Sequence, residues 1–315
     1  MITNNAYLPD LPAYLRYSIP VQTLPLLAGL SALLALAGWR LGVLTKRGAG
    51  AAFAVGCAFA GGAPEFYPAL VAMVVLGEAA TRLNQLLNPK NGQRRAPGGR
   101  RGAGSVLGNG GVAAATAFLS VVVSSISDFQ YTEMSPEAMF PLAMAIAGAL
   151  SAAAADTVAG EIGKAFRAPA YLVTRPFSGT RVAPGTDGAV SIAGTIAGAL
   201  AAAAIGWIAL SELLRKAYYF AGTFEVYPEL PYWLFFLLKP LVELWYSALD
   251  GGTILAAVAF SGVAASFMDS VLGATIEQGL LIRLGLSKEH RNHVVNFLAT
   301  LSGALIAAGL AYFLI

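Results

Sequence analysis

The residues that could do chemistry in this chain are carboxylates placed inside long apolar segments. Asp156 follows the apolar run AMFPLAMAIAGALSAAAA, and Asp269 lies within GVAASFMDSVLG. Neither has a basic residue on its own helical face within one turn. A charge at membrane depth costs about 2.5–3.5 kcal/mol on insertion scales, so such residues usually face the interior of a helix bundle and mark a functional site. Carboxylates there suit a hard cation such as Mg²⁺, which binds one or two of them together with substrate phosphates.

Polar and small residues recur at helical spacing in five segments, and residues three or four apart share one helix face. Simpler explanations stay open for several of them. Glu78 with Arg82, and Glu161 with Lys164, could be ion pairs between neighbouring turns, and polar side chains such as Asn296 could hydrogen-bond between helices. Glycine and alanine runs are explained best by close helix packing. The stripes are Glu78, Arg82 and Gln85; Arg101, Ser105 and Asn109; Asp156, Gly160 and Lys164; Ser266, Asp269, Ser270, Gly273 and Glu277; and Asn292, Asn296, Thr300 and Gly303.

The loop after Asp156 has the composition of a phosphate site. It reads RAPAYLVTRPFSGTRVAPGTDGAVSIAGT, and Thr186 or Asp187 is the expected N-cap of the apolar helix that follows. A helix N-terminus favours a phosphate, and arginines supply charge-assisted contacts. The alternative is an ordinary capped helix start with surface arginines. The candidate phosphate contacts in this loop are Arg175, Ser178, Gly179, Arg181, Thr186, Asp187 and Gly188.

Several other kinds of site are excluded by what the sequence lacks. There is no GxxxxGK[ST] phosphate loop and no GxGxxG after a strand. His290 and His293 are the only histidines, which excludes a histidine-rich metal centre, and Cys57 is the only cysteine, so there is no disulfide framework. The net charge of +3 comes from basic residues divided among loops, so no nucleic-acid partner is expected.

The elements that must hold these residues are transmembrane helices. The chain is 57% hydrophobic and only 12% charged, half the charged fraction of a soluble domain, and its mean hydropathy is +0.66. We expect an all-α polytopic membrane protein with a bundle of about seven to nine transmembrane helices; period-two alternation, the signature of a membrane barrel, is missing. Pro231–Tyr246 is a further, interrupted candidate. The predicted spans are Thr23–Leu44, Gly50–Ala69, Pro68–Leu83, Val106–Ser124, Ala138–Asp156, Val190–Leu210, Gly252–Leu272 and Val294–Ile315.

The domain organisation and the topology follow from these spans. Residues 1–20 contain no clear secretory signal and form a separate N-terminal segment, while residues 21–315 form a single transmembrane helical domain. Four basic clusters fall on one face of the predicted bundle, which the positive-inside rule makes cytoplasmic. We therefore expect a multi-pass protein of a bacterial or archaeal plasma membrane with its active site at the cytoplasmic face. The clusters are Lys46 and Arg47; Arg82, Lys90, Arg94, Arg95, Arg100 and Arg101; Lys164, Arg167, Arg175 and Arg181; and Arg283, Lys288 and Arg291.

Five motifs, in this order, resemble a known membrane family: GGRRGAGSVLGNGG, ADTVAGEIGK, TRPFSGTRVAPGTDGAVSIAGT, GVAASFMDSVLGATIEQ and NHVVNFLATLSG. It is the integral membrane family that contains the plant phytyl-phosphate kinase of the vitamin E (tocopherol) pathway, a human transmembrane protein and many archaeal and bacterial members of unknown function. More distantly, the stretch from Asp156 to Lys164 and the turn Gly185–Ser191 are similar to the pattern of dolichol kinase and phosphatidate cytidylyltransferase. Those enzymes use CTP and a divalent metal on lipid alcohols or lipid phosphates.

The resemblance implies a Mg²⁺-dependent phosphotransferase of lipid metabolism. It would transfer a phosphoryl group from a nucleoside triphosphate, with CTP as the expected donor, to an isoprenoid monophosphate such as phytyl or geranylgeranyl phosphate, giving the diphosphate. In the family, asparagine often stands at the position of Asp187, where an acid repels phosphate unless it holds a metal or caps the helix. The implied roles are catalysis for Asp156, Lys164 and Asp269; metal binding for Asp156, Asp269 and Glu161; phosphate clamping for Lys164, Arg101, Arg175 and Arg181; and lining of the site for Asn109, Thr186, Asp187, Gly188, Ser191 and Asn296.

Two other functions stay open. A CTP-dependent cytidylyltransferase acting on a lipid phosphate would use the same metal site but release diphosphate. An ion-coupled transporter would also place carboxylates between glycine-interrupted helices. Carboxylates gathered at one face beside the Thr186–Ser191 turn would favour an enzyme, and midplane burial with access from both sides would favour transport. The expected partners are the isoprenoid-phosphate substrate and membrane lipids, and the sequence leaves a homo-oligomer open.

Overall fold

The computed structural model describes residues 23–89, 100–129, 136–174, 181–220 and 251–314, and within them every predicted span forms a long helix. Six of the helices in these described ranges are long and apolar enough to cross a membrane, which confirms a polytopic helical membrane protein. The apolar helix Leu24–Arg40 is shorter, and α3 has 17 residues. Residues 1–20 and Pro231–Tyr246 lie outside the described residues. The long helices are α2 (Thr23–Arg40), α3 (Lys46–Gly62), α4 (Tyr67–Leu87), α5 (Ala103–Phe129), α6 (Pro136–Ala165), α7 (Ile192–Phe220), α9 (Gly251–Leu272) and α11 (Lys288–Ala311).

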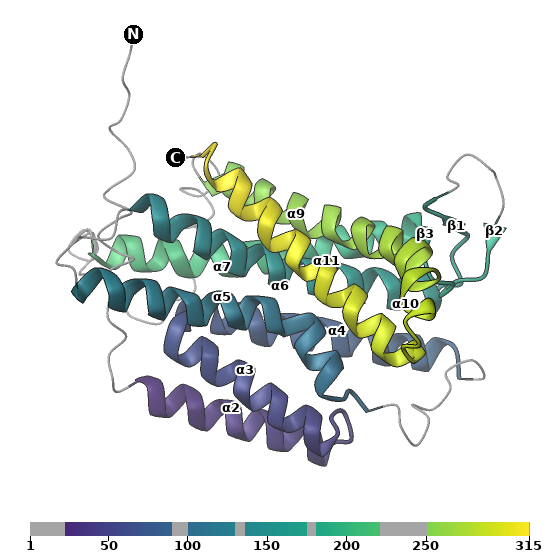
Figure 1. The fold of residues 1–315 in the computed structure, drawn as a ribbon, viewed down its shortest axis with the longest axis horizontal. Coiled ribbons are helices and arrows are strands. Elements are labelled where there is room, and N and C mark those ends of the chain that lie inside the picture. Colours follow the sequence, from purple (N-terminus) through teal and green to yellow (C-terminus); the bar gives the residue numbers. More distant parts are fainter. Residues whose placement is uncertain (1–22, 90–99, 130–135, 175–180, 221–250, 315) are drawn as a thin grey trace, which may run out of the picture.

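Helix α6 is the centre of the bundle. It contacts α4, α5, α7, α9 and α11, and most of its apolar stretch is buried inside the protein (Figure 1). Its sequence, rich in alanine and glycine, makes this position available, because small side chains let neighbouring helices approach closely. A β-carbon added at Gly303 of α11 would lie 2.8 Å from the carbonyl oxygen of Gly148 in α6. Small residues therefore set the interhelical distances that position the site.

One buried hydroxyl ties α6 to two of its neighbours. Ser151 is fully buried, and its Oγ lies 3.2 Å from the carbonyl oxygens of both Ala202 in α7 and Val258 in α9. In a bilayer the hydrophobic effect does not drive helices together, so interhelical hydrogen bonds and close packing hold the bundle together. This contact fixes α7 and α9 against the helix that carries Asp156.

The connections between helices are short where the sequence places turn residues. The 3₁₀ turn η1 (Pro64–Phe66) joins α3 to α4, as Gly61, Gly62 and Pro64 lead one to expect. Thr45, in the turn before α3, is the N-cap of that helix, and its side chain accepts a hydrogen bond from the Gly48 N–H at 2.9 Å. The same turn pairs with Arg101 through the bonds Thr45 N–H to Arg101 O and Arg101 N–H to Val43 O. The start of α5 is therefore held beside the start of α3.

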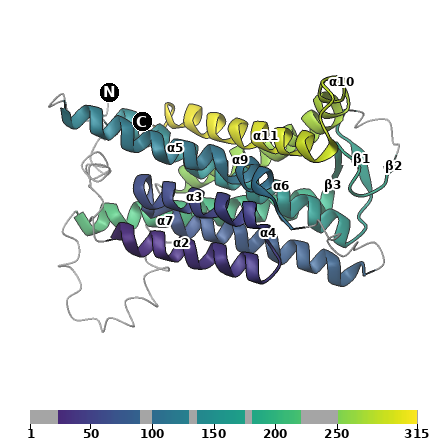
Figure 2. The ribbon, with the colours of Figure 1, turned by 60° about the horizontal axis from the view of Figure 1, so that its bottom comes forward.

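A small sheet, which the sequence did not predict, follows α6. Strands β1 (Ala170–Leu172), β2 (Arg181–Val182) and β3 (Ala189–Ser191) are antiparallel in the order β2-β1-β3, with Ala170 opposite Ser191. The π-helical turn η3 (Gly273–Glu277) and the short helix α10 (Leu280–Arg283) follow α9. The sheet and α10 lie at the same end of the bundle in both views (Figures 1 and 2). This end carries the candidate site.

Candidate active site

A cavity of about 360 Å³ lies where α5, α6, α7, α9 and α11 meet the loop between β2 and β3. Its wall is polar on the loop side, and Ala199, Val263 and Phe267 contribute an apolar part. In the described part of the chain, five carboxylates and two basic side chains line it. The carboxylates are Asp156, Glu161, Asp187, Asp269 and Glu277, and the basic residues are Arg101 and Lys164.

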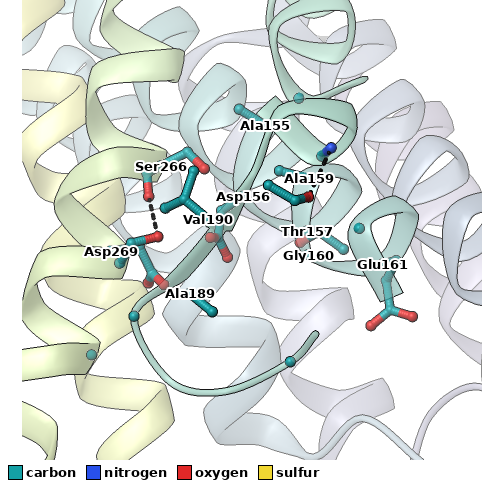
Figure 3. A pocket seen from close by; sticks show the side chains of 18 of the residues that line it. Ala155, Asp156, Thr157, Ala159, Gly160, Glu161, Ala189, Val190, Ser266 and Asp269 are labelled. Carbon is teal, nitrogen blue, oxygen red and sulfur yellow. Dashed lines mark hydrogen bonds between the residues drawn. The ribbon is translucent and has the colours of Figure 1, made fainter. Parts of the chain in front are cut away.

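Asp156 and Asp269 form the centre of this wall. Asp156 comes from α6 and Asp269 from α9, and their carboxyl groups lie in one cavity, near enough to interact directly with each other (Figure 3). Asp269 Oδ1 is buried and has no hydrogen-bond partner among the described residues. Two carboxylates this close need a shared proton or a cation between them. The sequence could not show this contact, because the two residues lie on different helices.

The end of α6 corrects one prediction about Asp156. The apolar span was expected to end at Asp156, whereas α6 runs on to Ala165 and carries Glu161 and Lys164 on its last turns, as the helical stripe from Asp156 to Lys164 predicts. No proline interrupts the segment after Asp156, and its alanines, Glu161 and Lys164 favour a helix, so the break comes only where the chain turns at Arg167, which has a positive φ of 48°. Asp156 therefore sits inside a continuous helix, with Lys164 two turns further along, near enough to interact with it electrostatically.

Glu161 is held by neighbours on two sides. Its Oε1 accepts a hydrogen bond from Lys164 Nζ at 2.5 Å, and its Oε2 accepts one from Asn84 Nδ2 of α4 at 2.8 Å. In Figure 3 its carboxylate points away from Asp156 and Asp269. These contacts favour the ion-pair explanation of Glu161 over metal binding.

The loop from Pro184 to Ser191 closes one side of the cavity. The predicted cap of α7 was wrong: neither Thr186 nor Asp187 caps the helix, because Ala189–Ser191 pairs with β1 first and α7 begins at Ile192. Ser191 Oγ instead accepts a hydrogen bond from the Gly194 N–H at 3.1 Å, as an N-cap side chain does. The first turn of α7 thus reaches the cavity through Ser191, Gly194 and Thr195.

Two glycines let this loop approach the helices. Gly185 and Gly188 have φ of +88° and +79°, a conformation that side chains disfavour. A β-carbon at Gly188 would lie 2.5 Å from Ala274 Cβ and 2.9 Å from Ser270 O. The neighbouring Asp187 accepts a hydrogen bond from Gln278 Nε2 at 2.5 Å and lies 3.7 Å from Lys288 Nζ. The loop is therefore fixed to the end of α9 and the start of α11.

The opposite side of the cavity is built by α5 and α11. Arg101 lines the cavity just before α5, and Asn109 and Asn296 follow on the two helices. Asn296 Nδ2 donates to Asn109 Oδ1 at 3.3 Å, and Thr300 Oγ1 donates to the carbonyl oxygen of Gly108 at 3.1 Å. The interhelical hydrogen bond that the sequence left open for Asn296 is therefore present, Thr300 makes another, and Asn296 also lines the cavity.

The structure thus brings together most of the residues singled out by sequence, and their roles remain predictions. Arg181 is exposed on β2 and is absent from the cavity wall, because the strand pairing with β1 directs this segment away from the helices. Arg175, Ser178 and Gly179 lie outside the described residues. The Glu78–Arg82 pair is confirmed as an ion pair at 3.0 Å and does not line the cavity. The predicted residues in the cavity wall are Arg101, Asn109, Asp156, Glu161, Lys164, Thr186, Asp187, Gly188, Ser191, Asp269 and Asn296.

The cavity also has polar lining that sequence reasoning gave no role. Glu277 was placed on the stripe with Asp269 but was assigned nothing, and the structure buries it to 3% exposure in the cavity wall. The other lining residues of this kind are Ser105, Thr157, Thr195, Ser266, Ser270 and Asn292. Their spacing to the assigned residues was the available signal, but spacing alone does not separate the cavity face from a lipid face.

Residues 29–304 match the family described as integral membrane protein DUF92. The chain belongs to this family. The match includes all five motifs that carried the resemblance, which is thereby confirmed at the level of the family. Protein VTE6, chloroplastic, of Arabidopsis thaliana is 32% identical over 177 residues, which are 56% of this chain and 45% of that protein, so less than half of the relative is covered. No solved structure gave a significant match.

Proposed function

We propose that this protein is a kinase that transfers a phosphoryl group from a nucleoside triphosphate, with CTP as the expected donor, to an isoprenoid monophosphate. The observation that carries the proposal is the contact between Asp156 and Asp269 in a cavity that also exposes Arg101 and Lys164. Family membership, and the resemblance of the motifs to the plant phytyl-phosphate kinase, support a prenyl phosphate as acceptor. All of these residues gather beside the Thr186–Ser191 turn, which favours an enzyme over a transporter.

The donor set of the cavity fits a divalent cation. Among the described residues no three His, Cys, Asp or Glu side chains could by themselves hold a metal ion. Mg²⁺ is commonly bound by only one or two carboxylates together with substrate phosphates, which is what Asp156 and Asp269 offer. The buried, unpartnered Oδ1 of Asp269 is an acceptor oxygen ready for such an ion. When bound, Mg²⁺ would neutralise the phosphate charge that develops during transfer.

The remaining groups would position the phosphates. Lys164 Nζ and the Arg101 guanidinium give charge-assisted hydrogen bonds to phosphate oxygens. The N-terminal turn of α7 adds a helix end, which favours anions. In the reaction, an oxygen of the acceptor monophosphate attacks the γ-phosphorus, the bond from that phosphorus to the β–γ bridging oxygen breaks, and the nucleoside diphosphate leaves. Catalysis of this kind depends mostly on positioning and charge stabilisation, so these side chains account for the proposed activity.

The apolar part of the wall would take the prenyl chain. Ala199 of α7 and Val263 and Phe267 of α9 line the cavity. Both helices also expose large apolar side chains on their outer faces, among them Leu200 and Phe260. A chain that leaves the cavity between α7 and α9 would therefore pass directly into lipid.

The test uses purified protein in detergent with Mg²⁺, geranylgeranyl or phytyl monophosphate, and each nucleoside triphosphate labelled at the α- or the γ-phosphate. We expect γ-label in a prenyl diphosphate, its loss on chelation of Mg²⁺, and a loss of at least about 100-fold in Asp156→Asn and Asp269→Asn, as when a transition-state charge contact is removed. The matched control is Glu289→Gln, whose carboxylate is 76% exposed and lies outside the cavity wall. Transfer of α-label would instead identify a cytidylyltransferase. Absence of any labelled lipid from folded protein would refute the proposal for these acceptors.

A further inference from the structure

Glu277 is a buried carboxylate that the proposed chemistry has not used. It is 3% exposed, it lines the cavity, and its Oε1 has no hydrogen-bond partner among the described residues. No ion-pair contact to it is present in the described part of the chain, although Lys288 and Arg291 lie near enough to act on it electrostatically. Asp269 Oδ1 is likewise buried and has no hydrogen-bond partner among the described residues. Two buried acceptor oxygens without donors thus face one cavity, from residues about two helical turns apart.

A π-helical turn places Glu277 on the same face as Asp269. In a regular α-helix of 3.6 residues per turn, a residue eight positions along is rotated by about 80°. The turn Gly273–Glu277 is π-helical, and its i→i+5 hydrogen bonds take up one extra residue. Glu277 therefore has about the rotation that a residue seven positions along has in an α-helix, about 20° from Asp269. Such turns occur frequently at functional sites.

The charges of the cavity point to more than one cation. Of its five carboxylates, Glu161 is paired with Lys164, and Asp187 is held by Gln278 and Lys288. The other three, Asp156, Asp269 and Glu277, have no ion-pair contact among the described residues, and Asp269 interacts electrostatically with both of the others. One divalent cation would balance two of these negative charges and leave the third beside bound phosphates. Like charges this close need a shared proton or a cation between them, and the unpartnered oxygens of Asp269 and Glu277 leave room for a cation.

We infer that Glu277 and Asp269 form a second divalent-cation site, next to the one between Asp156 and Asp269, with Asp269 shared by both ions. Each ion would be held by two carboxylates and completed by water or phosphate oxygens, as is usual for Mg²⁺. The inference rests on the proposed function for its phosphate ligands. Its chemical use would be to neutralise the acceptor phosphate while the other ion neutralises the nucleotide, since two-metal sites hold both partners of a displacement.

The experiment measures Mn²⁺ alone, bound to purified protein in detergent, by equilibrium dialysis and by electron paramagnetic resonance. We expect two Mn²⁺ per chain in the wild type, one in Glu277→Gln and two in Glu289→Gln. At saturation the wild type should show spin coupling between the ions, and Glu277→Gln should not. If Glu277→Gln does not fold, Glu277→Asp keeps the charge and should lower the affinity for the second Mn²⁺ by about tenfold or more, as changes around metal sites do.

Two results would overturn the inference: fewer than two Mn²⁺ in the wild type, or unchanged stoichiometry and coupling in folded Glu277→Gln. Neither result depends on catalysis, because no nucleotide or lipid is present. A kinase with a single cation would pass the labelling assay and fail this one. A protein with two cations but no kinase activity would do the reverse, so the two proposals fail separately.

Discussion

Replacing Gly188 by alanine tests whether the loop before α7 is held in place by its contact with the end of α9. Gly188 has φ of +79°, and an added β-carbon would lie 2.5 Å from Ala274 Cβ. Carbon atoms in ordinary contact are about 3.5–4.0 Å apart, so the loop must move by about 1 Å or more. Asp187 precedes Gly188 in the same loop, so this movement also disturbs its hydrogen bond with Gln278. The substitution therefore shifts one wall of the cavity without removing any functional side chain.

The magnitude follows from two separate costs. A residue with a β-carbon loses about 1–2 kcal/mol in the left-handed conformation. Overpacking against fixed atoms adds about 1–3 kcal/mol. Gly188→Ala should therefore lower the free energy of unfolding by about 2–5 kcal/mol. A displacement of about 1 Å near reacting groups can reduce turnover by about 100-fold.

The matched control is Gly285→Ala. Gly285 also has a positive φ, +73°, but nothing lies within 4 Å of an added β-carbon, so it carries the conformational cost alone. Thermal unfolding in detergent and turnover of prenyl phosphate would be measured for both variants. We expect Gly285→Ala to lose only about 1–2 kcal/mol of stability and to keep its turnover. Equal stability and equal turnover in the two variants would show that the contact between the loop and α9 does not position the site.

Two further predictions concern what the cavity binds. Arg101→Gln should reduce kcat/KM by about 10–100-fold, since a hydrogen bond to a charged group is worth about 1.5–3 kcal/mol. The control Arg181→Gln should change kcat/KM by no more than about twofold, because Arg181 is exposed on β2. Equal effects of the two substitutions in steady-state kinetics would contradict the role of Arg101. Ala199→Leu should raise KM for a twenty-carbon prenyl phosphate by about tenfold or more, because added methylenes in an apolar pocket cost about 1–3 kcal/mol, and should leave a five-carbon acceptor unaffected. The control Ile196→Leu changes a side chain that is 57% exposed on α7, and the same chain-length profile in both variants would rule out the proposed path.

The arrangement of helices could be read from the sequence to a large extent. Each of the eight predicted spans became a helix, because apolar length is a local property that the bilayer itself selects. The pairs Glu78–Arg82 and Glu161–Lys164 were also predictable, since both partners lie on one helix within a turn. Asp156 and Asp269 were found for the same reason: an acid inside an apolar run is visible without knowing what it contacts.

Where prediction failed, the cause was a contact made elsewhere in the chain. The cap of α7 was assigned to Thr186 or Asp187 from local composition, but pairing of β3 with β1 delays the helix to Ile192, and Ser191 becomes its cap. The same sheet leaves Arg181 exposed and outside the cavity wall, which its position in the sequence could not show. Glu277 shares the predicted stripe with Asp269, but spacing alone gave it no role, and only its burial in the cavity wall and the π turn at Gly273–Glu277 single it out.

By itself, the sequence determined that this chain is a membrane helix bundle of its family and which polar residues cannot face lipid, since both follow from the cost of placing charge and unpaired backbone in hydrocarbon. Only the tertiary structure decided which of those residues meet. The close packing of α6 against α9, permitted by alanine, glycine and serine, brings Asp156 to Asp269 across more than a hundred residues of chain. The loop held at Gly188 and the π turn at Gly273–Glu277 then complete the cavity, because each orients its side chains through contacts that no local pattern encodes.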